Sequence, residues 1–551
     1  MARRRSRRSR SQPLDRLAIM AIAGLSLALG LLVLSGDHAT ARVRDFTWQD
    51  RQVGAEDQAF LLTFSRPMDV ASVEQNLTLD PPLPGKVSWA GRRMAYTLTE
   101  PLPYGESFSV SLAGARDRYA ATTDGASRFE PFQSRFETRP RAFLYIGAEG
   151  DEANRLVLAD LSRQERTILT PRNLSVMAFK PYPLGDRVLF SASDINQAGN
   201  LLNQQIYTVT TGLTPRPPID FMGPRPPLWQ QLWPQRQAAP SGEIDLVLDN
   251  STYQNLKFDL SADGQTIVVQ RVNQQNPADF GPWIVRQGAA PQPIDTEPGG
   301  DFLIAPDSQS LLLLQGQGTA IIDLGAEQTR GPRQPLDFLP NYGRVLDVTA
   351  DGSAAAMVNF NQDDPEKRFT ESLFLVTNQG REEELLQVSG AIVDAQFDPT
   401  RQFLYVLASE LVEAPAEADT LQADDAYVEQ PLLLVITLVG GETRPLLRLP
   451  QQQRLHMSVA PDGRSLLIDL AGQTTPDSAA GNPVIWHLPL VQPAVSLQAA
   501  AAAEGFDSTA AAEPEGRTGG RDALGGDASP LPTVSDPEEL PFSGLQATWL
   551  P

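Results

Sequence analysis

The chain has 551 residues, a formal net charge of −22 and no cysteine. Its length allows two or three domains with sizeable cores. The lack of cysteine excludes disulfides, a cysteine nucleophile and thiolate metal ligands. There are only three histidines, His38, His456 and His487, which leaves few ways to build a zinc site or an acid–base pair. We therefore expect no metal and no cofactor.

A basic segment followed by an uncharged one begins the chain. Residues 1–16 contain seven arginines and a single acid, and residues 17–34 contain no charged residue. At about 1.5 Å per residue, a helix of this length just crosses the hydrocarbon core of a bilayer. The pattern predicts a transmembrane signal anchor over 17–35, with the segment 1–16 in the cytoplasm and the body outside it. Ala39-Thr40-Ala41 keeps a second interpretation open, in which the protein is cleaved near Ala41 and secreted.

Short alternating runs of apolar residues fill the segment 43–140. Phe60, Leu62 and Phe64 form the first clear run, and similar runs follow, separated by turns rich in proline and glycine. A period of two places alternate side chains on one face of a strand. Several such strands within about a hundred residues predict an all-β sandwich with one buried face per sheet.

The same segment resembles the bacterial Ig-like domain of S-layer and other surface proteins. The stretches that carry the resemblance are Phe64–Asp69, Leu77–Leu79, Tyr96–Leu98, Pro101–Leu102, Tyr104–Gly105, Phe108–Leu112 and Gly114–Asp117. The resemblance implies an Ig-like fold, a surface location and a spacer or adhesive role without enzymatic activity. Together with the anchor, it predicts a protein of the bacterial cytoplasmic membrane whose body lies in the periplasm or extracytoplasmic space.

An apolar run, a tight turn and a second apolar run recur six times over 143–496. The turn residues Asp263, Asp307 and Asp351 are 44 residues apart in succession. A period of about 40–50 residues built from several strands is typical of propeller blades, which stack in a ring because a single blade cannot cover its own apolar faces. The turns also resemble those of TolB-like and WD-type propellers. We predict six blades, and the hairpin within 143–158 either helps to close the ring or forms a seventh.

Three segments depart from this repeat. A proline-rich insertion at 214–240 contains Trp229 and Trp233, which we predict either as contacts for a partner or as cover for the propeller itself. The segment 410–429 is acidic and predicts a solvated loop.

The third departure is the C-terminal segment 497–551, which is rich in alanine, glycine and acids. This composition predicts a disordered tail. Its last residues regain apolar character and include Phe542 and Trp549. We interpret this end either as a docking motif that contacts a partner or as an end without a role.

No nucleophile elbow in the exported body, Walker loop or His-Glu-x-x-His motif is present. An acidic body also argues against binding to nucleic acid. The sequence favours a membrane-anchored, non-enzymatic binding or scaffold protein whose propeller presents loops to an envelope protein or cell-wall component. The alternative is an envelope polysaccharide hydrolase or lyase with carboxylates in the propeller channel, because such a pair leaves no spacing signature. A purely structural envelope component is a third interpretation.

Overall fold

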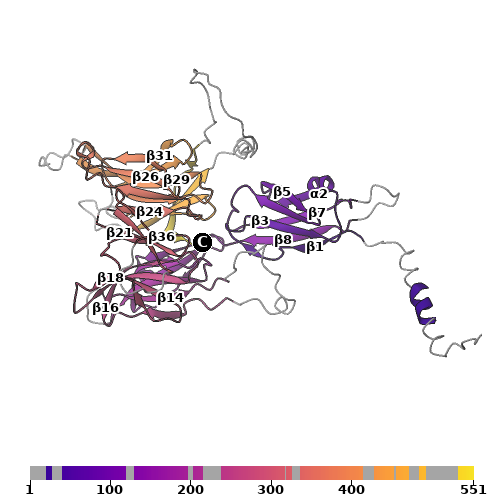
Figure 1. The fold of residues 1–551 in the computed structure, drawn as a ribbon, viewed down its shortest axis with the longest axis horizontal. Helices are drawn as coiled ribbons and strands as arrows, with labels where there is room; N and C mark the ends of the chain where they lie inside the picture. Colours follow the sequence, from indigo (N-terminus) through magenta and orange to yellow (C-terminus); the bar gives the residue numbers. More distant parts are fainter. Residues whose placement is uncertain are drawn as a thin grey trace, which may run out of the picture. The chain divides into compact units, whose positions relative to one another are not determined.

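The computed structural model describes residues 20–27, 40–118, 129–196, 203–214, 238–316, 318–325, 335–413, 427–451, 455–470, 483–491 and 531–551. The chain divides into two compact units. One comprises residues 1–50, 59–98 and 108–136, and the other comprises residues 51–58, 99–107 and 137–551. Strands dominate both units (Figure 1).

The predicted membrane anchor is described only in part. Residues 20–27 form a helix whose apolar side chains, such as Ile22 and Leu25, are exposed. Within the described residues, no helix is both long enough and apolar enough to cross a membrane. The rest of 17–35 lies outside the described residues.

Two four-stranded sheets form the N-terminal sandwich. The first has the order β1-β3-β6-β5 and the second the order β2-β8-β7-β4. The strands of the first sheet are β1 (Val43–Phe46), β3 (Ala59–Phe64), β6 (Arg93–Leu98) and β5 (Gly85–Ala90). Those of the second are β2 (Gln52–Val53), β8 (Phe132–Thr138), β7 (Ser107–Leu112) and β4 (Leu77–Asp80), and a short helix, α2 (Val70–Asn76), precedes β4. The described residues thus form the two-sheet sandwich that the alternating runs predict.

Aromatic side chains join these two sheets. Phe60 on β3 and Phe136 on β8 are both buried, and Trp48 is buried between them. The ring centroids of Trp48 lie 5.2 Å from Phe60 and 5.0 Å from Phe136, both in edge-on arrangements. Burying each large apolar side chain stabilises the fold by about 2–3 kcal/mol, and edge-on ring pairs add to this. The alternation predicted for Phe60, Leu62 and Phe64 is confirmed, since all three are buried.

The second unit contains five sheets of four consecutive antiparallel strands. The first three of these sheets contain β12 (Leu174–Pro181), β13 (Arg187–Asp194), β14 (Gln205–Thr210), β15 (Ile244–Leu248); β16 (Tyr253–Leu260), β17 (Thr266–Asn273), β18 (Phe280–Arg286), β19 (Gln292–Pro293); and β20 (Phe302–Ile304), β21 (Ser310–Gln315), β22 (Gly318–Asp323), β23 (Asp337–Leu339). The other two contain β24 (Arg344–Val348), β25 (Ala354–Asn359), β26 (Glu371–Thr377), β27 (Glu382–Val388); and β28 (Ile392–Phe397), β29 (Phe403–Glu413), β30 (Tyr427–Thr437), β31 (Thr443–Arg448). Each sheet is one propeller blade.

The C-terminal strand completes two further blades. Strand β36 (Glu538–Trp549) pairs through its first half with β34 (Val484–Val491) and through its second half with β9 (Ala142–Gly147). One blade therefore has the order β32-β33-β34-β36 and the next has the order β36-β9-β10-β11. The remaining strands of these blades are β32 (Leu455–Val459), β33 (Ser465–Leu470), β10 (Leu156–Asp160) and β11 (Glu165–Ile168), and a short strand, β35 (Thr533–Val534), also pairs with β34. The described residues form seven blades, so the hairpin left open by the sequence belongs to the seventh.

The prediction of a disordered tail over 497–551 is wrong for residues 531–551. Within this part, Leu540 and Trp549 are buried in the core of the two closing blades. The average composition of the tail is polar, but its last residues supply the apolar positions that two incomplete blades need. Residues 492–530 lie outside the described residues.

Candidate functional site

Strands β12, β16, β20, β24, β28 and β32 are edge strands of their blades, and the second half of β36 is the edge strand of the blade it shares with β9. Of these edge strands, here called the inner strands, β16 lies beside β20, β24 beside β28, β28 beside β32 and β32 beside β36. Four inner-strand side chains accept a hydrogen bond from a backbone N–H of the following blade. These inter-blade latches are Asp259 from Ile304 N (2.7 Å), Asp347 from Phe397 N (2.8 Å), Gln396 from Val459 N (2.9 Å) and Ser458 from Trp549 N (3.1 Å).

Two of the latches are carboxylates, buried Asp259 and half-buried Asp347. An inner edge strand leaves N–H groups without a strand partner, and each such group needs an acceptor when it is buried. Asp259 also pairs with Lys180, and Asp347 accepts a second bond from Val348 N at 2.9 Å. Burial raises the pKa of Asp347 to about 7, although the two N–H donors work in the opposite direction. Both acids therefore connect neighbouring blades.

A second acidic group surrounds His456 on β32. His456 Nε2 lies 3.1 Å from Thr548 Oγ1 on the closing strand, and Asp469 Oδ2 accepts a bond from Gln546 N at 2.5 Å. Asp394 accepts a bond from Gln396 Nε2 at 3.0 Å. Burial raises the pKa of Asp394 and of Asp469, and the charge of His456 opposes the shift in both. This group ties β36 to the ring, and a hollow of about 300 Å³ opens beside Asp347 and Asp394.

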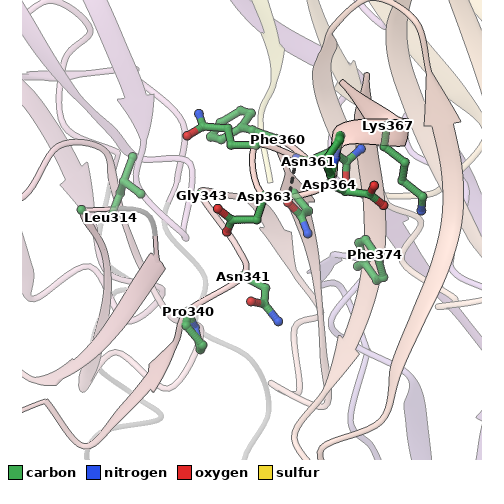
Figure 2. Close-up of a pocket in the computed structure, with 14 residues that line it drawn as sticks. Leu314, Pro340, Asn341, Gly343, Phe360, Asn361, Asp363, Asp364, Lys367 and Phe374 are labelled. Carbon is green, nitrogen blue, oxygen red and sulfur yellow. Dashed lines mark hydrogen bonds between the residues drawn. The ribbon is translucent and has the colours of Figure 1, made fainter. Parts of the chain in front are cut away.

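A larger pocket lies between the blades β20–β23 and β24–β27, with a volume of about 540 Å³ (Figure 2). This volume is within the roughly 300–1,000 Å³ that is typical of ligand pockets. Three connections form its wall: the end of β21, the segment 340–343 between β23 and β24, and the segment 359–370 between β25 and β26. Loops held by a rigid scaffold are where binding residues concentrate.

Amides and carboxylates dominate the lining of this pocket. The polar lining side chains are Asn341, Asn359, Asn361, Gln362, Asp363, Asp364 and Lys367. Phe360 and Phe374 supply aromatic surface. In Figure 2, the side chains of Asn341 and Asp363 lie near the middle of the view, between the Pro340 segment and the Phe360–Lys367 loop.

A buried asparagine fixes the loop that borders the pocket. Asn361 Nδ2 donates to Thr370 O (3.2 Å), Thr370 Oγ1 (2.9 Å) and Ser372 Oγ (3.0 Å), and Asn361 is 6% exposed. Thr370 Oγ1 in turn donates to Lys367 O at 2.6 Å. Asp364 accepts from Glu366 N at 2.9 Å and so caps the short 3-10 turn Pro365–Lys367. The loop is therefore held at both ends.

Two residues of this loop have backbone dihedrals that are unusual for side chains other than glycine. Asn361 has φ +51° and Phe369 has φ +68°. Asparagine tolerates this region, whereas a bulky aromatic residue there is an outlier that costs roughly 1–3 kcal/mol. Phe369 is also 85% exposed. Strain that is held in place by the surrounding structure, next to a pocket, is a feature of functional loops.

The residues predicted as partner contacts lie elsewhere. Trp549 is 5% exposed and packs edge-on against Phe143, with ring centroids 5.8 Å apart. Phe542 is partly buried and stacks on Tyr145 at 5.8 Å. Both side chains pack in the ring closure, and their role as contacts for a partner stays a prediction. Trp229 and Trp233 lie outside the described residues.

The sequence did not indicate the pocket. Its residues come from three separate connections, and polar residues in a connection have no period to follow. One signal was available in the sequence, the run Asn359-Phe360-Asn361-Gln362-Asp363-Asp364. A tight turn between two strands needs fewer residues than these six polar or aromatic ones.

Comparisons with known proteins found similar solved structures but no relative by sequence. No family model matches the sequence, and no curated protein matches it. Similar solved structures include TolB from Acinetobacter baumannii, with 11% identity over 69% of this chain and 81% of that chain and a TM-score of 0.35. An oligogalacturonate lyase in complex with manganese has 12% identity over 57% of this chain and 79% of that chain, with a TM-score of 0.37. Hydrazine synthase from Kuenenia stuttgartiensis has 14% identity over 59% and 79%, with a TM-score of 0.34. The chain is similar to β-propeller proteins of differing function.

Proposed function

We propose that this protein is a membrane-anchored, extracytoplasmic binding protein whose propeller holds an envelope ligand in the pocket between the blades β20–β23 and β24–β27. The observation that carries the proposal is the loop 359–370. Its polar side chains line a cavity of about 540 Å³. Buried Asn361 fixes the loop, and Phe369 in it has a strained backbone.

The N-terminal part of the chain fits this role. The uncharged stretch 17–34 behind a basic segment supports a membrane anchor. The sandwich would act as an Ig-like spacer between the anchor and the propeller, which is the role that such modules mostly have. The propeller itself would be of the TolB-like type, with its loops turned to a protein or cell-wall partner.

The catalytic alternative requires a pair of carboxyl groups facing a substrate, one as acid and the other as base or nucleophile. Asp259 and Asp347 on inner strands and Asp469 on β33 each accept a hydrogen bond from a backbone N–H of another strand. Using such a group in proton transfer would weaken a contact between blades. The channel therefore favours a structural role, and the pocket at the loops favours binding.

A binding assay with full-length protein in detergent tests the proposal. Envelope fractions would be incubated with the wild type, with the pocket variant Asn341→Ala/Gln362→Ala/Asp363→Ala, and with the channel variant Asp394→Asn. We expect the pocket variant to lose the bound material and the channel variant to keep it. Binding that survives in the pocket variant would contradict the proposal. Turnover of an envelope polysaccharide that disappears in Asp394→Asn would instead establish the enzyme.

A further inference from the structure

Three polar side chains of the pocket have unused hydrogen-bonding groups. Within the described residues, the side chains of Asn341, Gln362 and Asp363 make no hydrogen bond, and all three are exposed to solvent. An amide offers an acceptor oxygen and two N–H donors, and a carboxylate offers acceptors only. A ligand that both donates and accepts, as a hydroxyl group does, can satisfy the whole set.

The charge of the pocket excludes anionic ligands. Asp363 and Asp364 line it, and Lys367 is the one cationic side chain among the lining residues. Lys367 is already bound to both carboxylate oxygens of Glu384, at 3.2 and 3.0 Å. Phosphate, sulfate or uronate groups would therefore meet like charges without a free cation. A neutral ligand is not repelled by these carboxylates.

Aromatic surface accompanies these polar groups. Phe360 lines the pocket and sits so close to Gly343 that a Cβ there would lie 2.1 Å from its ring. Phe374 on β26 also lines the pocket, and its ring is half-buried. A sugar ring combines hydroxyl edges with a face of C–H groups that can lie on such a ring.

We propose that this pocket binds a neutral sugar of a glycan chain, with Asn341, Gln362 and Asp363 bonded to its hydroxyls and the aromatic surface of Phe360 and Phe374 against its C–H face. The inference rests on the proposed function, because it names the ligand class of the same pocket. A peptide is the less favourable occupant. The pocket wall consists largely of connections and strand ends, whereas an extended peptide is usually held by main-chain pairing along a sheet edge.

Calorimetric titration of full-length protein in detergent tests the ligand class. The probes are oligomers of N-acetylglucosamine, glucose and mannose, a uronate oligomer of equal length and an uncharged peptide of similar size. We expect saturable binding of at least one neutral oligosaccharide and none of the uronate. Phe374→Leu, which keeps an apolar side chain but removes the aromatic face, should weaken that binding about tenfold, as loss of an aromatic anchor does. Val439→Ala, which alters a side chain that is 85% exposed and lies outside the pocket lining, should leave it within about twofold.

The outcomes separate the two proposals. Equal affinities of Phe374→Leu and the wild type, or a preference for the uronate or the peptide, would overturn the glycan assignment. If envelope material still binds the wild type but not the pocket variant, the proposed function then stands and only the ligand class is wrong. If the pocket variant binds envelope material as well as the wild type does, both proposals fail.

Discussion

Replacing Trp549 tests whether the C-terminal strand closes the ring. The side chain is 5% exposed, and its ring lies 5.8 Å from Phe143, 6.1 Å from His487 and 6.0 Å from the guanidinium of Arg141. Its indole N–H has no partner within the described residues, so the change to alanine removes packing but no hydrogen bond of the ring. Truncating a buried tryptophan to alanine costs about 3–5 kcal/mol.

The expected change in melting temperature follows from the size of the propeller. Its unfolding entropy is roughly 0.7 kcal/mol/K, so Trp549→Ala should lower the melting temperature of the propeller by about 4–7 °C. Differential scanning calorimetry of full-length protein measures this, and Val439→Ala serves as the exposed control, with an expected change of about 0.5 kcal/mol or less. An equal melting temperature for both variants would refute closure by β36. Lost partner binding with unchanged stability would support the docking interpretation.

Three further changes test the channel and the loop. Burial raises the pKa of Asp347 to about 7, so the folded protein retains a proton that the unfolded chain releases near pH 4. The stability of the folded protein should therefore fall as the pH rises from about 4 to about 7. Melting temperatures measured across this pH range should fall less steeply for Asp347→Asn than for the wild type. An equally steep fall in both would contradict the raised pKa of Asp347. Gln396→Ala should lower the free energy of unfolding by about 2–4 kcal/mol, because it leaves Met457 O and Val459 N without a partner. Thermal unfolding measures this change, and a loss below about 0.5 kcal/mol would show that this latch is dispensable. Asn361→Ala removes the three hydrogen-bond contacts that the side-chain amide makes in the loop. It should lower the free energy of unfolding by about 1–3 kcal/mol and weaken ligand binding. Unchanged affinity would show that the order of this loop does not matter for binding.

Features with a local cause could be predicted from the sequence. The turns at Asp263, Asp307 and Asp351 mark their blades because a tight turn between two strands depends on a few neighbouring residues. Their constant spacing of 44 residues identifies the repeat. The sandwich was equally accessible, since alternation within one strand decides which side chains are buried.

Closure of the ring by the C-terminal strand could not be predicted from the sequence. It pairs Gly147 with Gly544 and Phe143 with Trp549, residues that lie about four hundred positions apart in the chain. Composition averaged over the tail concealed the apolar residues at its end. The strain at Phe369 was also invisible, because a positive φ at a residue other than glycine has no compositional signal.

The latch pattern of the inner ring is interrupted at the junction between the blades β20–β23 and β24–β27. The latch residues Asp259, Asp347, Gln396 and Ser458 each stand four positions before the turn residues Asp263, Asp351, Thr400 and Asp462. In the blade β20–β23, the equivalent position before Asp307 is Leu303, which cannot accept a hydrogen bond.

The N–H of Val348 in the next blade is instead satisfied by Oδ1 of Asp347, its own neighbour, while Oδ2 of Asp347 serves Phe397. One carboxylate thus replaces the missing latch, and within the described residues no side chain of β20 accepts a hydrogen bond from β24 at this position. The pocket lies between these same two blades. Asp347, which looks like a catalytic acid, therefore serves the backbone of β24 and of the following blade at once, at the junction where Leu303 supplies no latch.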